Sequence, residues 1–377
     1  MKKIQMVDLV SQYENIKEEV LEGISEILSK AQFINGPSVH EFSKNLASYH
    51  RVEHAIPCGN GTDALQIAMM ALDLKPGDEV ITTPFTFIAT AEVIALLGLK
   101  PVFVDINPHT YNLDEVQIEA AITHKTKAIV PVHLFGQCCE MTHIRRLAES
   151  HGLYVIEDNA QSIGADYHSP DGKKEKSGTL GHIGATSFFP SKNLGGYGDG
   201  GALVTDDDAL AKRIRSICNH GSTKRYHHDH IGVNSRLDTI QAHVLNVKLK
   251  YLGQYIQSRI HAADRYDELL KDIEGVTPPF RASFTSHVFH QYTLRVPAKY
   301  RDGLVEHFSN EGLPCGVYYP IPLHIQDAYK EFGYSKGDFP ESEKASLEVM
   351  SLPMHTELTM DQQEHIVEHI RSYLASA

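Results

Sequence analysis

The residue of this chain with the clearest chemical potential is Lys192, which lies between a short apolar run and a glycine-rich loop. The apolar run extends from Gly184 to Phe189, and the loop holds five glycines between Gly195 and Gly201. Lysine is usually a solvated surface cation, but between a buried strand and backbone without side-chain bulk it can present a reactive amine to a flat ligand. A desolvated lysine can form a Schiff base with a carbonyl compound. The alternative is an ordinary surface lysine beside a flexible loop.

Two neighbouring carboxylates, Glu157 and Asp158, end an apolar run that begins at Leu153. Ligands of open α/β sheets bind at the carboxyl ends of the strands. Pyridoxal phosphate needs a carboxylate beside its ring nitrogen, because the protonated ring acts as an electron sink. Strand alternation directs the two side chains to opposite faces, so only one of them can meet a given ligand. We assign Asp158 to this role, with Glu157 as the competitor and a helix cap as the alternative reading of Asp158.

A phosphate-binding pattern lies further upstream. The run from His54 to Cys58 reads as a strand, and a turn containing Gly59 and Gly61 leads from it into a helix. The free N–H groups and the positive dipole end of such a helix, together with the Thr62 hydroxyl, bind an anion without any cationic side chain. A plain capped turn is the alternative.

Two further side chains suit the same ligand. Ser187, five residues before Lys192, can add a hydroxyl to the phosphate site. Phe87 can stack on the cofactor ring, although an aromatic at such a position, taken alone, is usually part of the core.

Together these motifs resemble the DegT/DnrJ/EryC1/StrS family of sugar aminotransferases. The resemblance covers nearly the whole chain and includes the runs Val7–Tyr13, Phe33–Pro37, Asn60–Leu65 and Tyr318–His324. It implies an α/β fold of the fold-type I (aspartate aminotransferase-like) pyridoxal-phosphate transferases, with a mostly parallel central sheet and a smaller C-terminal α+β domain. We expect a large cofactor-binding domain over residues 1–250 and a small domain over residues 251–377.

The resemblance also implies roles for the site residues. Lys192 would form the Schiff base with pyridoxal 5′-phosphate, Asp158 would pair with the pyridine nitrogen, and Gln161 would lie against the ring near its hydroxyl. The residues implied for the phosphate are Gly61, Thr62, Asp63 and Ser187.

Within the family, the chain is similar to the branch that aminates a 3-oxo sugar, UDP-2-acetamido-2-deoxy-3-oxo-D-glucuronate, in the biosynthesis of surface polysaccharide such as lipopolysaccharide. The runs that carry this similarity are Phe188–Gly195 and Arg225–Asp238. The similarity implies that Arg236, Tyr318 and Tyr319 contact the sugar nucleotide and that L-glutamate is the amino donor. It also implies a homodimer with active sites at the subunit interface, in which Asn234 reaches the cofactor phosphate of the neighbouring subunit.

Other functions fit less of the chain. A 4-keto sugar aminotransferase, acting on a dTDP-, UDP- or GDP-linked 4-keto-6-deoxy sugar, would share the fold. So would a pyridoxal-dependent sugar dehydratase, but related dehydratases carry histidine in place of Lys192. A non-catalytic, cofactor-binding regulatory protein would be favoured by a fused helix-turn-helix region, for which we find no candidate segment.

Two rival motifs are set aside by their context. The run from Gly196 to Gly201 matches G-x-G-x-x-G, but a strand is expected after it where a dinucleotide fingerprint requires a helix. His227, His228 and His230 lie on one loop without the spacing of metal ligands, so we expect no metal site.

Composition and charge agree with a cofactor enzyme. The chain has 377 residues, and its 42% hydrophobic content is ample for two domains. Its formal charge of −13 argues against a nucleic-acid partner. An acidic protein must bind a doubly anionic substrate through local basic groups, for which Lys224, Arg225 and Arg236 are the candidates.

The remaining features concern the cellular location. The five cysteines are odd in number and lack CxxC pairing, which suits a reducing cytoplasm. The N-terminus meets Asp8 instead of a long apolar core, so we expect no signal peptide. Pro84 and Glu92 interrupt the most apolar window, Val80–Leu99, so we expect a strand and a helix there and no membrane span.

Alternating strand and helix patterns position these residues. The strand-like runs are Glu79–Thr83, Pro101–Asp105, Ala128–His133, Leu153–Asp158, Ala185–Phe189 and Ala202–Thr205. Helices are predicted at Asn112–Thr123, Met141–Ser150, Asp206–Cys218 and from after Asn234 to about Leu270. This alternation predicts a mostly parallel sheet covered by helices. The last helix is expected to open with a capping box at Thr359–Gln362.

Overall fold

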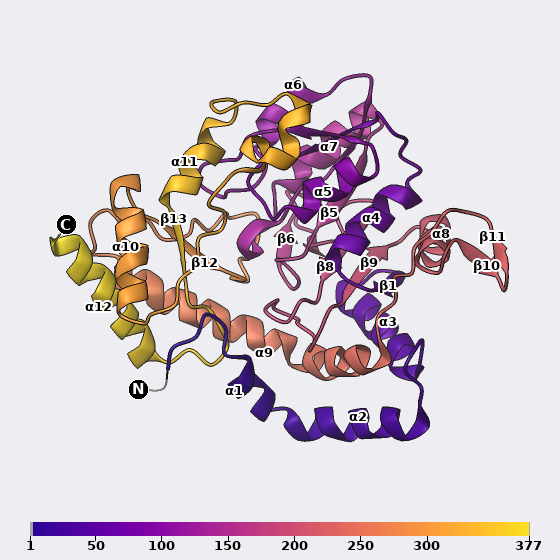
Figure 1. Cartoon of the computed structure of the whole chain (residues 1–377), viewed down its shortest axis with the longest axis horizontal. Coiled ribbons are helices and arrows are strands. Elements are labelled where there is room, and N and C mark those ends of the chain that lie inside the picture. Colours follow the sequence, from indigo (N-terminus) through magenta and orange to yellow (C-terminus); the bar gives the residue numbers. More distant parts are fainter. Residues whose placement is uncertain (1–2, 377) are drawn as a thin grey trace.

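A seven-stranded sheet forms the centre of the computed structural model, which describes residues 3–376 (Figure 1). Its strand order is β1-β9-β8-β5-β4-β2-β3. The strands are β1 (His54–Cys58), β2 (Glu79–Thr82), β3 (Lys100–Phe103), β4 (Thr126–Ile129), β5 (Tyr154–Asp158), β8 (Ile183–Ser187) and β9 (Gly201–Thr205). All six predicted strand runs are therefore present, with boundaries shifted by a few residues.

Strand direction gathers the candidate residues at one edge of this sheet. Five neighbouring strands, from β8 through β5, β4 and β2 to β3, run parallel, whereas β9 is antiparallel to both β8 and β1. The ends of β1, β5 and β8 and the start of β9 consequently lie on the same side. The predicted α/β class and mostly parallel sheet are confirmed.

Helices cover both faces because neighbouring residues of each strand point to opposite sides. On one face α3 (Pro37–His50), α7 (Met141–His151) and α9 (Thr239–Leu270) enclose a core that includes Ile81 and Val155. On the other face α4 (Gly61–Ala71), α5 (Ala89–Leu96) and α8 (Asp208–Cys218) pack on Val80 and Ile156. Because both faces of the sheet are covered by helices, polar site residues lie at the ends of the strands.

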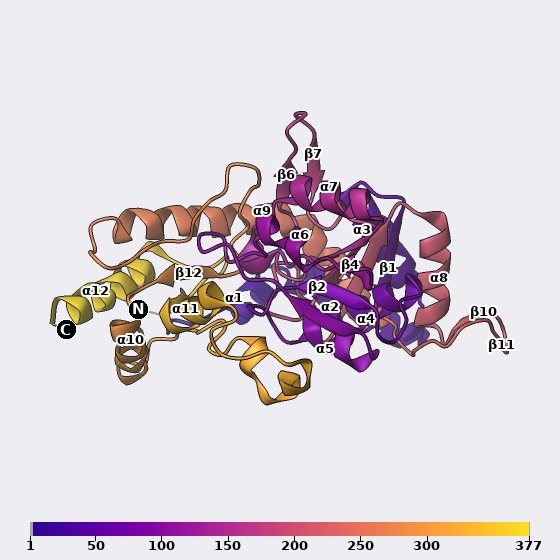
Figure 2. The same ribbon diagram turned by 90° about the horizontal axis from the view of Figure 1, so that it is seen from above.

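Helix α9 has 32 residues and joins two cores (Figures 1 and 2). Its first half packs in the large core, and its second half, with Ala262 and Tyr266, packs in a separate C-terminal core. The elements of the C-terminal core are β12 (Tyr292–Arg295), α10 (Ala298–Asn310), β13 (Val349–Leu352) and α12 (Met360–Ser376). Ile4 from the start of the chain also belongs to this core. The predicted domain boundary at residue 250 falls within α9, and the division remains a prediction.

The remaining elements are short or peripheral. They are α1 (Leu9–Glu14), α2 (Lys17–Lys30), α6 (Ile118–Ala121), β6 (Asp166–His168), β7 (Lys174–Lys176), β10 (Ser222–Lys224), β11 (His227–His228) and α11 (Pro340–Glu348), with 3₁₀ turns at Glu115–Gln117, Leu134–Gly136, Leu323–Ile325 and Asp327–Phe332. Hairpins β6–β7 and β10–β11 project from the body (Figure 2).

The sequence prediction of helices is correct in part. The capping box of α12 is confirmed, because Thr359 Oγ1 accepts from the Gln362 N–H at 3.3 Å while Gln362 Oε1 accepts from the Thr359 N–H at 3.1 Å. The predicted helix at residues 112–123 is wrong in its extent, since only a 3₁₀ turn and the four residues of α6 are helical there.

Candidate active site

Asp158 ends β5 at the site edge of the sheet and is buried. Its Oδ2 accepts from Thr90 Oγ1 at 2.8 Å, and its Oδ1 accepts from the Ala160 N–H at 3.1 Å. Burial raises the pKa of Asp158, whereas these two hydrogen bonds and the charge of Lys192 act in the opposite direction. Two hydrogen bonds thus fix the carboxylate, which lies near enough to Lys192 for the two charges to interact.

Both carboxylate oxygens of the competing residue, Glu157, accept hydrogen bonds from other parts of the protein. Its Oε2 accepts from His133 Nε2 at 2.7 Å and from the Gly178 N–H at 2.8 Å. Its Oε1 accepts from the N–H groups of Leu180 and Gly181, both at 2.5 Å. Glu157 therefore fastens a loop on the face of β5 opposite to Asp158, as strand alternation predicts.

Lys192 lies in the loop between β8 and β9, and its backbone N–H donates to the Phe189 carbonyl at 2.8 Å. The side chain is partly exposed, yet the surrounding protein lowers its pKa to about 8, with desolvation as the main cause and Asp158 opposing it. An amine with this pKa is substantially neutral near pH 8 and can act as a nucleophile or a base.

The N-terminus of α4 forms the predicted anion site. Asn60 Oδ1 caps the helix by accepting from the Asp63 N–H at 2.8 Å. A β-carbon on Gly61 would lie 2.6 Å from Cβ of Ser187, so glycine is what permits the Ser187 hydroxyl to stand beside this helix end. The partly exposed residues Gly61, Thr62 and Ser187 thus border the same opening.

Asp63 has a different contact from the one implied for it. Its Oδ2 accepts from Ser235 Oγ at 2.6 Å, and the same hydroxyl accepts from the Gly59 N–H at 2.9 Å. Asp63 therefore ties the segment that contains Asn234 and Arg236 to the anion site.

Aromatic side chains form the remaining wall. Phe87 is 57% exposed, and its ring centroid lies 6.5 Å from that of Tyr319. The Tyr319 hydroxyl accepts from Gln161 Nε2 at 3.1 Å, while Gln161 Oε1 accepts from the Phe135 N–H at 2.8 Å. The Tyr318 ring lies 6.1 Å from the Tyr319 ring. A large exposed aromatic beside polar groups suits stacking on a flat ligand.

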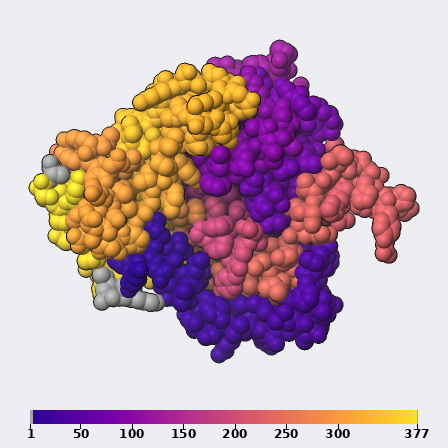
Figure 3. Space-filling model, viewed as in Figure 1, coloured from indigo at the N-terminus to yellow at the C-terminus, as the bar shows by residue number. Residues whose placement is uncertain are grey.

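Asn234 and Arg236 lie at the outer side of this arrangement. Asn234 is exposed, and Arg236 NH1 donates to Asn219 Oδ1 over a long 3.5 Å. The hairpin β10–β11 just before them extends away from the body (Figure 3). Its tip carries Tyr226, which is 81% exposed.

Two contributors were not found in the sequence. Thr90 and Ser235 hold Asp158 and Asp63, but each lies far along the chain from its carboxylate. The sequence signal that could have identified them is their position beside residues already singled out. Thr90 lies three residues after Phe87, and Ser235 directly follows Asn234.

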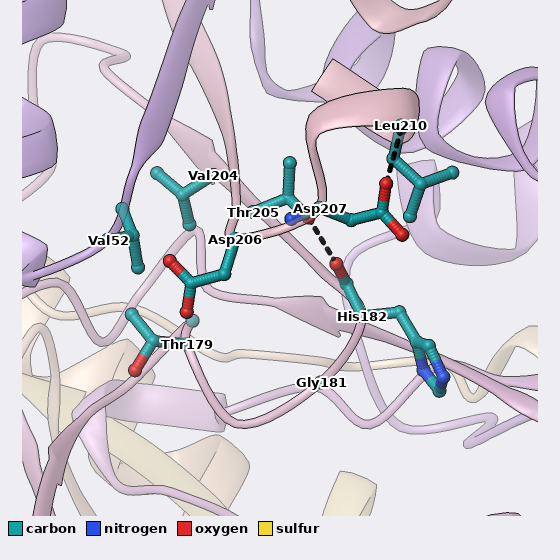
Figure 4. A pocket seen from close by; sticks show the side chains of 10 residues that line it. Val52, Thr179, Gly181, His182, Val204, Thr205, Asp206, Asp207 and Leu210 are labelled. Atoms are coloured by element: carbon teal, nitrogen blue, oxygen red, sulfur yellow. Dashed lines mark hydrogen bonds between the residues drawn. The ribbon is translucent and has the colours of Figure 1, made fainter. Parts of the chain in front are cut away.

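A cavity of about 180 Å³ lies at the opposite edge of the sheet and is separate from this site (Figure 4). It is bordered by Val52, His182 and the carboxylates of Asp206 and Asp207. Both carboxylates are used locally, since Asp206 accepts from the Glu53 N–H and Asp207 caps α8. Two carboxylates would also repel a phosphate.

The residues present at the site edge fit pyridoxal phosphate. An amine of lowered pKa interacts with a buried carboxylate, and a helix N-terminus with two hydroxyls and a closely approached glycine offers a phosphate cradle. The exposed ring of Phe87 lies beside Tyr319, which is bonded to Gln161. Over the described chain, no group of three or more His, Cys, Asp or Glu side chains could hold a metal ion. None of the helices between residues 3 and 376 has the length and apolar character needed to cross a membrane.

Comparison with known proteins agrees with this geometry. A profile of the DegT/DnrJ/EryC1/StrS aminotransferase family matches residues 14–371. The chain is 48% identical to a UDP-2-acetamido-2-deoxy-3-oxo-D-glucuronate aminotransferase of Pseudomonas aeruginosa, over 93% of this chain and 95% of the relative. It is 47% identical to a "pleiotropic regulatory protein" of Geobacillus stearothermophilus, over 98% of each chain. It is 43% identical to a UDP-N-acetyl-3-dehydro-α-D-glucosamine 3-aminotransferase of Acidithiobacillus ferrooxidans, also over 98% of each.

Solved structures share the whole fold. A DegT/DnrJ/EryC1/StrS aminotransferase from Brucella abortus superposes with a TM-score of 0.93 at 42% identity, covering 98% of this chain and 99% of the other. NtdA from Bacillus subtilis, which has the cofactor PMP bound, gives a TM-score of 0.91 at 32% identity and covers 100% of this chain and 86% of the other.

Proposed function

The chain belongs to the DegT/DnrJ/EryC1/StrS aminotransferase family, and from this premise we propose that it transfers the amino group of L-glutamate to a UDP-linked 3-oxo-2-acetamido sugar, the 3-oxo-glucuronate. It is a pyridoxal-phosphate-dependent nucleotide-sugar aminotransferase. Two relatives at 43% and 48% identity are named for 3-oxo UDP-sugars that differ at C6, which favours amination at C3 over C4.

The observation that carries the proposal is the electrostatic interaction of Lys192 with buried Asp158, together with the N-terminus of α4 beside Ser187. An amine with a pKa lowered to about 8 suits an aminotransferase because it must alternate between nucleophile, base and acid near neutral pH. A carboxylate that interacts with this same amine suits a positively charged ring nitrogen.

Asp158, Thr90 and Lys192 have separate proposed roles in the proton transfers. When bound, pyridoxal phosphate supplies an electron sink that stabilises a carbanion next to nitrogen. Asp158 keeps the ring nitrogen protonated, and Thr90 holds Asp158 in place. The Lys192 Nζ would carry a proton from the α-carbon of the donor to C4′ of the cofactor in the first half-reaction, and from C4′ to C3 of the sugar in the second.

The remaining groups bind and orient. The N–H groups at Gly61 and Thr62, with the Ser187 hydroxyl, hold the phosphate, and Asp63 supports this site through Asn60 and Ser235. Phe87 stacks on the ring, and Gln161, fixed by Tyr319, lies near the ring hydroxyl. Tyr318 and Tyr319 contact the sugar nucleotide.

We assign Arg236 to the uronate carboxylate. The planar guanidinium can donate two parallel hydrogen bonds to a carboxylate, which the hydroxymethyl group of the matching glucosamine cannot accept in the same way. Among the described residues, the Arg236 side chain makes one hydrogen bond, to Asn219, and this bond is long enough to be exchanged for a substrate.

We also propose a homodimer in which Asn234 serves the phosphate of the neighbouring subunit. The support is its exposure and the exposed tip of the adjacent hairpin, whose Tyr226 contacts little within its own chain besides Arg225. Active sites would then lie at the subunit interface. The cysteines are all free, which suits the proposed cytoplasmic role in making precursors of surface polysaccharide.

The test is a substrate panel given to wild type and Arg236→Ala. Purified enzyme is incubated with L-glutamate and with UDP-linked 3-oxo-glucuronate, 3-oxo-glucosamine or a 4-keto-6-deoxy sugar, and amino-sugar formation is followed by mass spectrometry. The proposal expects the highest kcat/KM for the uronate and a loss in Arg236→Ala confined to it. Leaving a carboxylate unpaired in a closed site costs about 2–5 kcal/mol. Equal losses on uronate and glucosamine would assign Arg236 to the diphosphate, and cofactor binding without turnover on any sugar would favour a regulatory protein.

A further inference from the structure

The loop between β8 and β9 holds Lys192. Phe188 and Leu194 anchor its first part in the core, and Asn193 Nδ2 donates to the Val288 carbonyl at 3.1 Å, whereas the glycine-rich part from Gly195 to Gly200 has little side-chain bulk to fix its position. Its backbone bonds include Lys192 N–H to the Phe189 carbonyl and Gly196 N–H to the Phe188 carbonyl, both at 2.8 Å. A β-carbon on Gly195 would lie 2.3 Å from the Pro190 carbonyl oxygen, so the loop folds tightly back on itself. The glycine-rich part of the loop therefore depends on outside groups for rigidity.

Two side chains of α9 supply contacts to this loop. Lys248 Nζ donates to the Gly195 carbonyl at 2.8 Å and lies 4.6 Å from the centroid of the Tyr197 ring. Gln241 Oε1 accepts from the Tyr197 N–H at 2.7 Å. Because Gln241 and Lys248 are seven residues apart, they share one face of the helix.

Lys248 is unusual for a lysine. Its side chain is 2% exposed, and no carboxylate among residues 3–376 lies within ion-pair distance of its amine. Burial alone lowers its pKa, to about 8. A buried ammonium is costly, and an apolar side chain of similar length at such a position is often neutral or stabilising. Stability of the core therefore does not account for this residue.

We propose that Lys248, assisted by Gln241, is a positioning residue that fixes the glycine loop from α9 and so sets the place of the Lys192 amine. The inference rests on the proposed role of Lys192. The ammonium bonds the carbonyl three residues after Lys192, and its contact with the Tyr197 ring fixes the loop a second time. Small displacements of a catalytic group cost large factors in rate, so this tether bears on the reaction.

The test compares Lys248→Met with a matched control on the same helix. Lys250→Met also removes a lysine, but one that pairs with Glu19 at the surface, 2.9 Å away. Each variant is examined by hydrogen exchange of the amides in residues 189–203 of the cofactor-free protein, by thermal unfolding, and by kcat and KM with glutamate and the keto sugar. Gln241→Leu, at a partly exposed position, serves as a second variant if Lys248→Met does not fold.

The inference expects faster exchange confined to the loop in Lys248→Met, an unchanged unfolding midpoint, and a kcat lower by about tenfold or more with KM within twofold. Gln241→Leu should change the same quantities in the same direction but less, and Lys250→Met should match wild type. Unchanged loop exchange would overturn the inference. Faster exchange throughout the protein with a lower unfolding midpoint would reduce Lys248 to a structural residue.

Faster loop exchange with an unchanged kcat would overturn the inference as well. The proposed function has its own test. If borohydride still traps the cofactor on the protein in Lys192→Ala, the proposed role of Lys192 is wrong.

Discussion

At the scale of the residue, the Lys192 amine should make the rate of cofactor attachment depend on pH, and this rate can be measured without turnover of substrate. The neutral amine is the nucleophile, and desolvation lowers the pKa of Lys192 from the ordinary 10.5 to about 8. The rate of covalent attachment of pyridoxal phosphate to the cofactor-free protein should therefore rise with pH, reach half of its maximum at about pH 8, and level off at higher pH. Borohydride trapping of the bound cofactor between pH 6 and 10 gives the midpoint. A midpoint near 10 would mean that Lys192 is solvated, and Lys192→Ala should show no trapping at this position.

Substitutions at the two adjacent carboxylates should have different effects, with activity lost at Asp158 and stability lost at Glu157. Asp158→Asn should still bind the cofactor but lose orders of magnitude in the half-reaction with glutamate, because a neutral amide no longer keeps the ring nitrogen protonated. Stopped-flow absorbance after mixing with glutamate gives this rate.

Glu157→Gln is the matched control for Asp158→Asn. Glu157 accepts hydrogen bonds from His133 and from three backbone N–H groups, so the amide should lower the free energy of unfolding by about 3–5 kcal/mol while leaving the half-reaction near its wild-type rate. Denaturant unfolding measures the first quantity. The reverse pattern in the two variants would transfer the role of Asp158 to Glu157.

Residues with local signals could be predicted from the sequence, and residues defined by distant partners could not. Lys192 and Asp158 stand at recognisable ends of strands, and the structure places their charges close together. Thr90 lies 68 residues from Asp158, and Lys248 lies 53 residues from Gly195, so only the folded chain reveals those contacts.

At the scale of the element, the same contrast holds. The strands were predictable because buried runs alternate with helical patterns, whereas residues 112–123 carry a helical pattern that tertiary contacts override. Asn112 donates to the Gln137 carbonyl and accepts from the Leu134 N–H, and Leu113 forms a β-bridge with Ile106. These bonds hold the segment extended until the 3₁₀ turn at Glu115.

The projecting hairpin β10–β11 gives a prediction at this scale. It presents Lys224, Arg225 and an 81% exposed Tyr226 beyond the body of the chain. Replacing residues 223–229 with a short glycine linker should leave the fold of the single chain unchanged, because the hairpin contributes little to either core. Where light scattering shows that the dimer is retained, the glutamate half-reaction should also keep its wild-type rate. The KM for the nucleotide sugar should rise by about tenfold or more, since truncating a charged contact to a bound anion typically costs 2–5 kcal/mol. An unchanged KM would exclude the hairpin from substrate binding.

At the scale of the whole molecule, a shared active site predicts recovery of activity by mixing two defective proteins. Lys192→Ala removes the amine, and Asn234→Asp places a negative charge where the cofactor phosphate of the partner is expected. Each variant alone should have little activity. In a twofold-symmetric dimer, random exchange of subunits leaves about a quarter of the sites with both residues intact.

The measurement is the rate of sugar amination after the two variants are unfolded together and refolded, compared with each variant treated alone. If Asn234 serves the site of its own chain, every site in the mixed dimer that retains Lys192 also carries Asn234→Asp, and no recovery occurs. A monomer at assay concentration by light scattering would contradict the shared site directly.

The place of Ile4 in the C-terminal core has a consequence for how the protein is made. Ile4 is buried with residues of α10 and α12, and the Met354 N–H donates to the Met6 carbonyl at 3.2 Å (Figure 1). During translation Ile4 and Met6 leave the ribosome long before Met354 is synthesised. They remain without these native partners while the sheet domain is made, so the C-terminal core can be completed only after that domain has been synthesised.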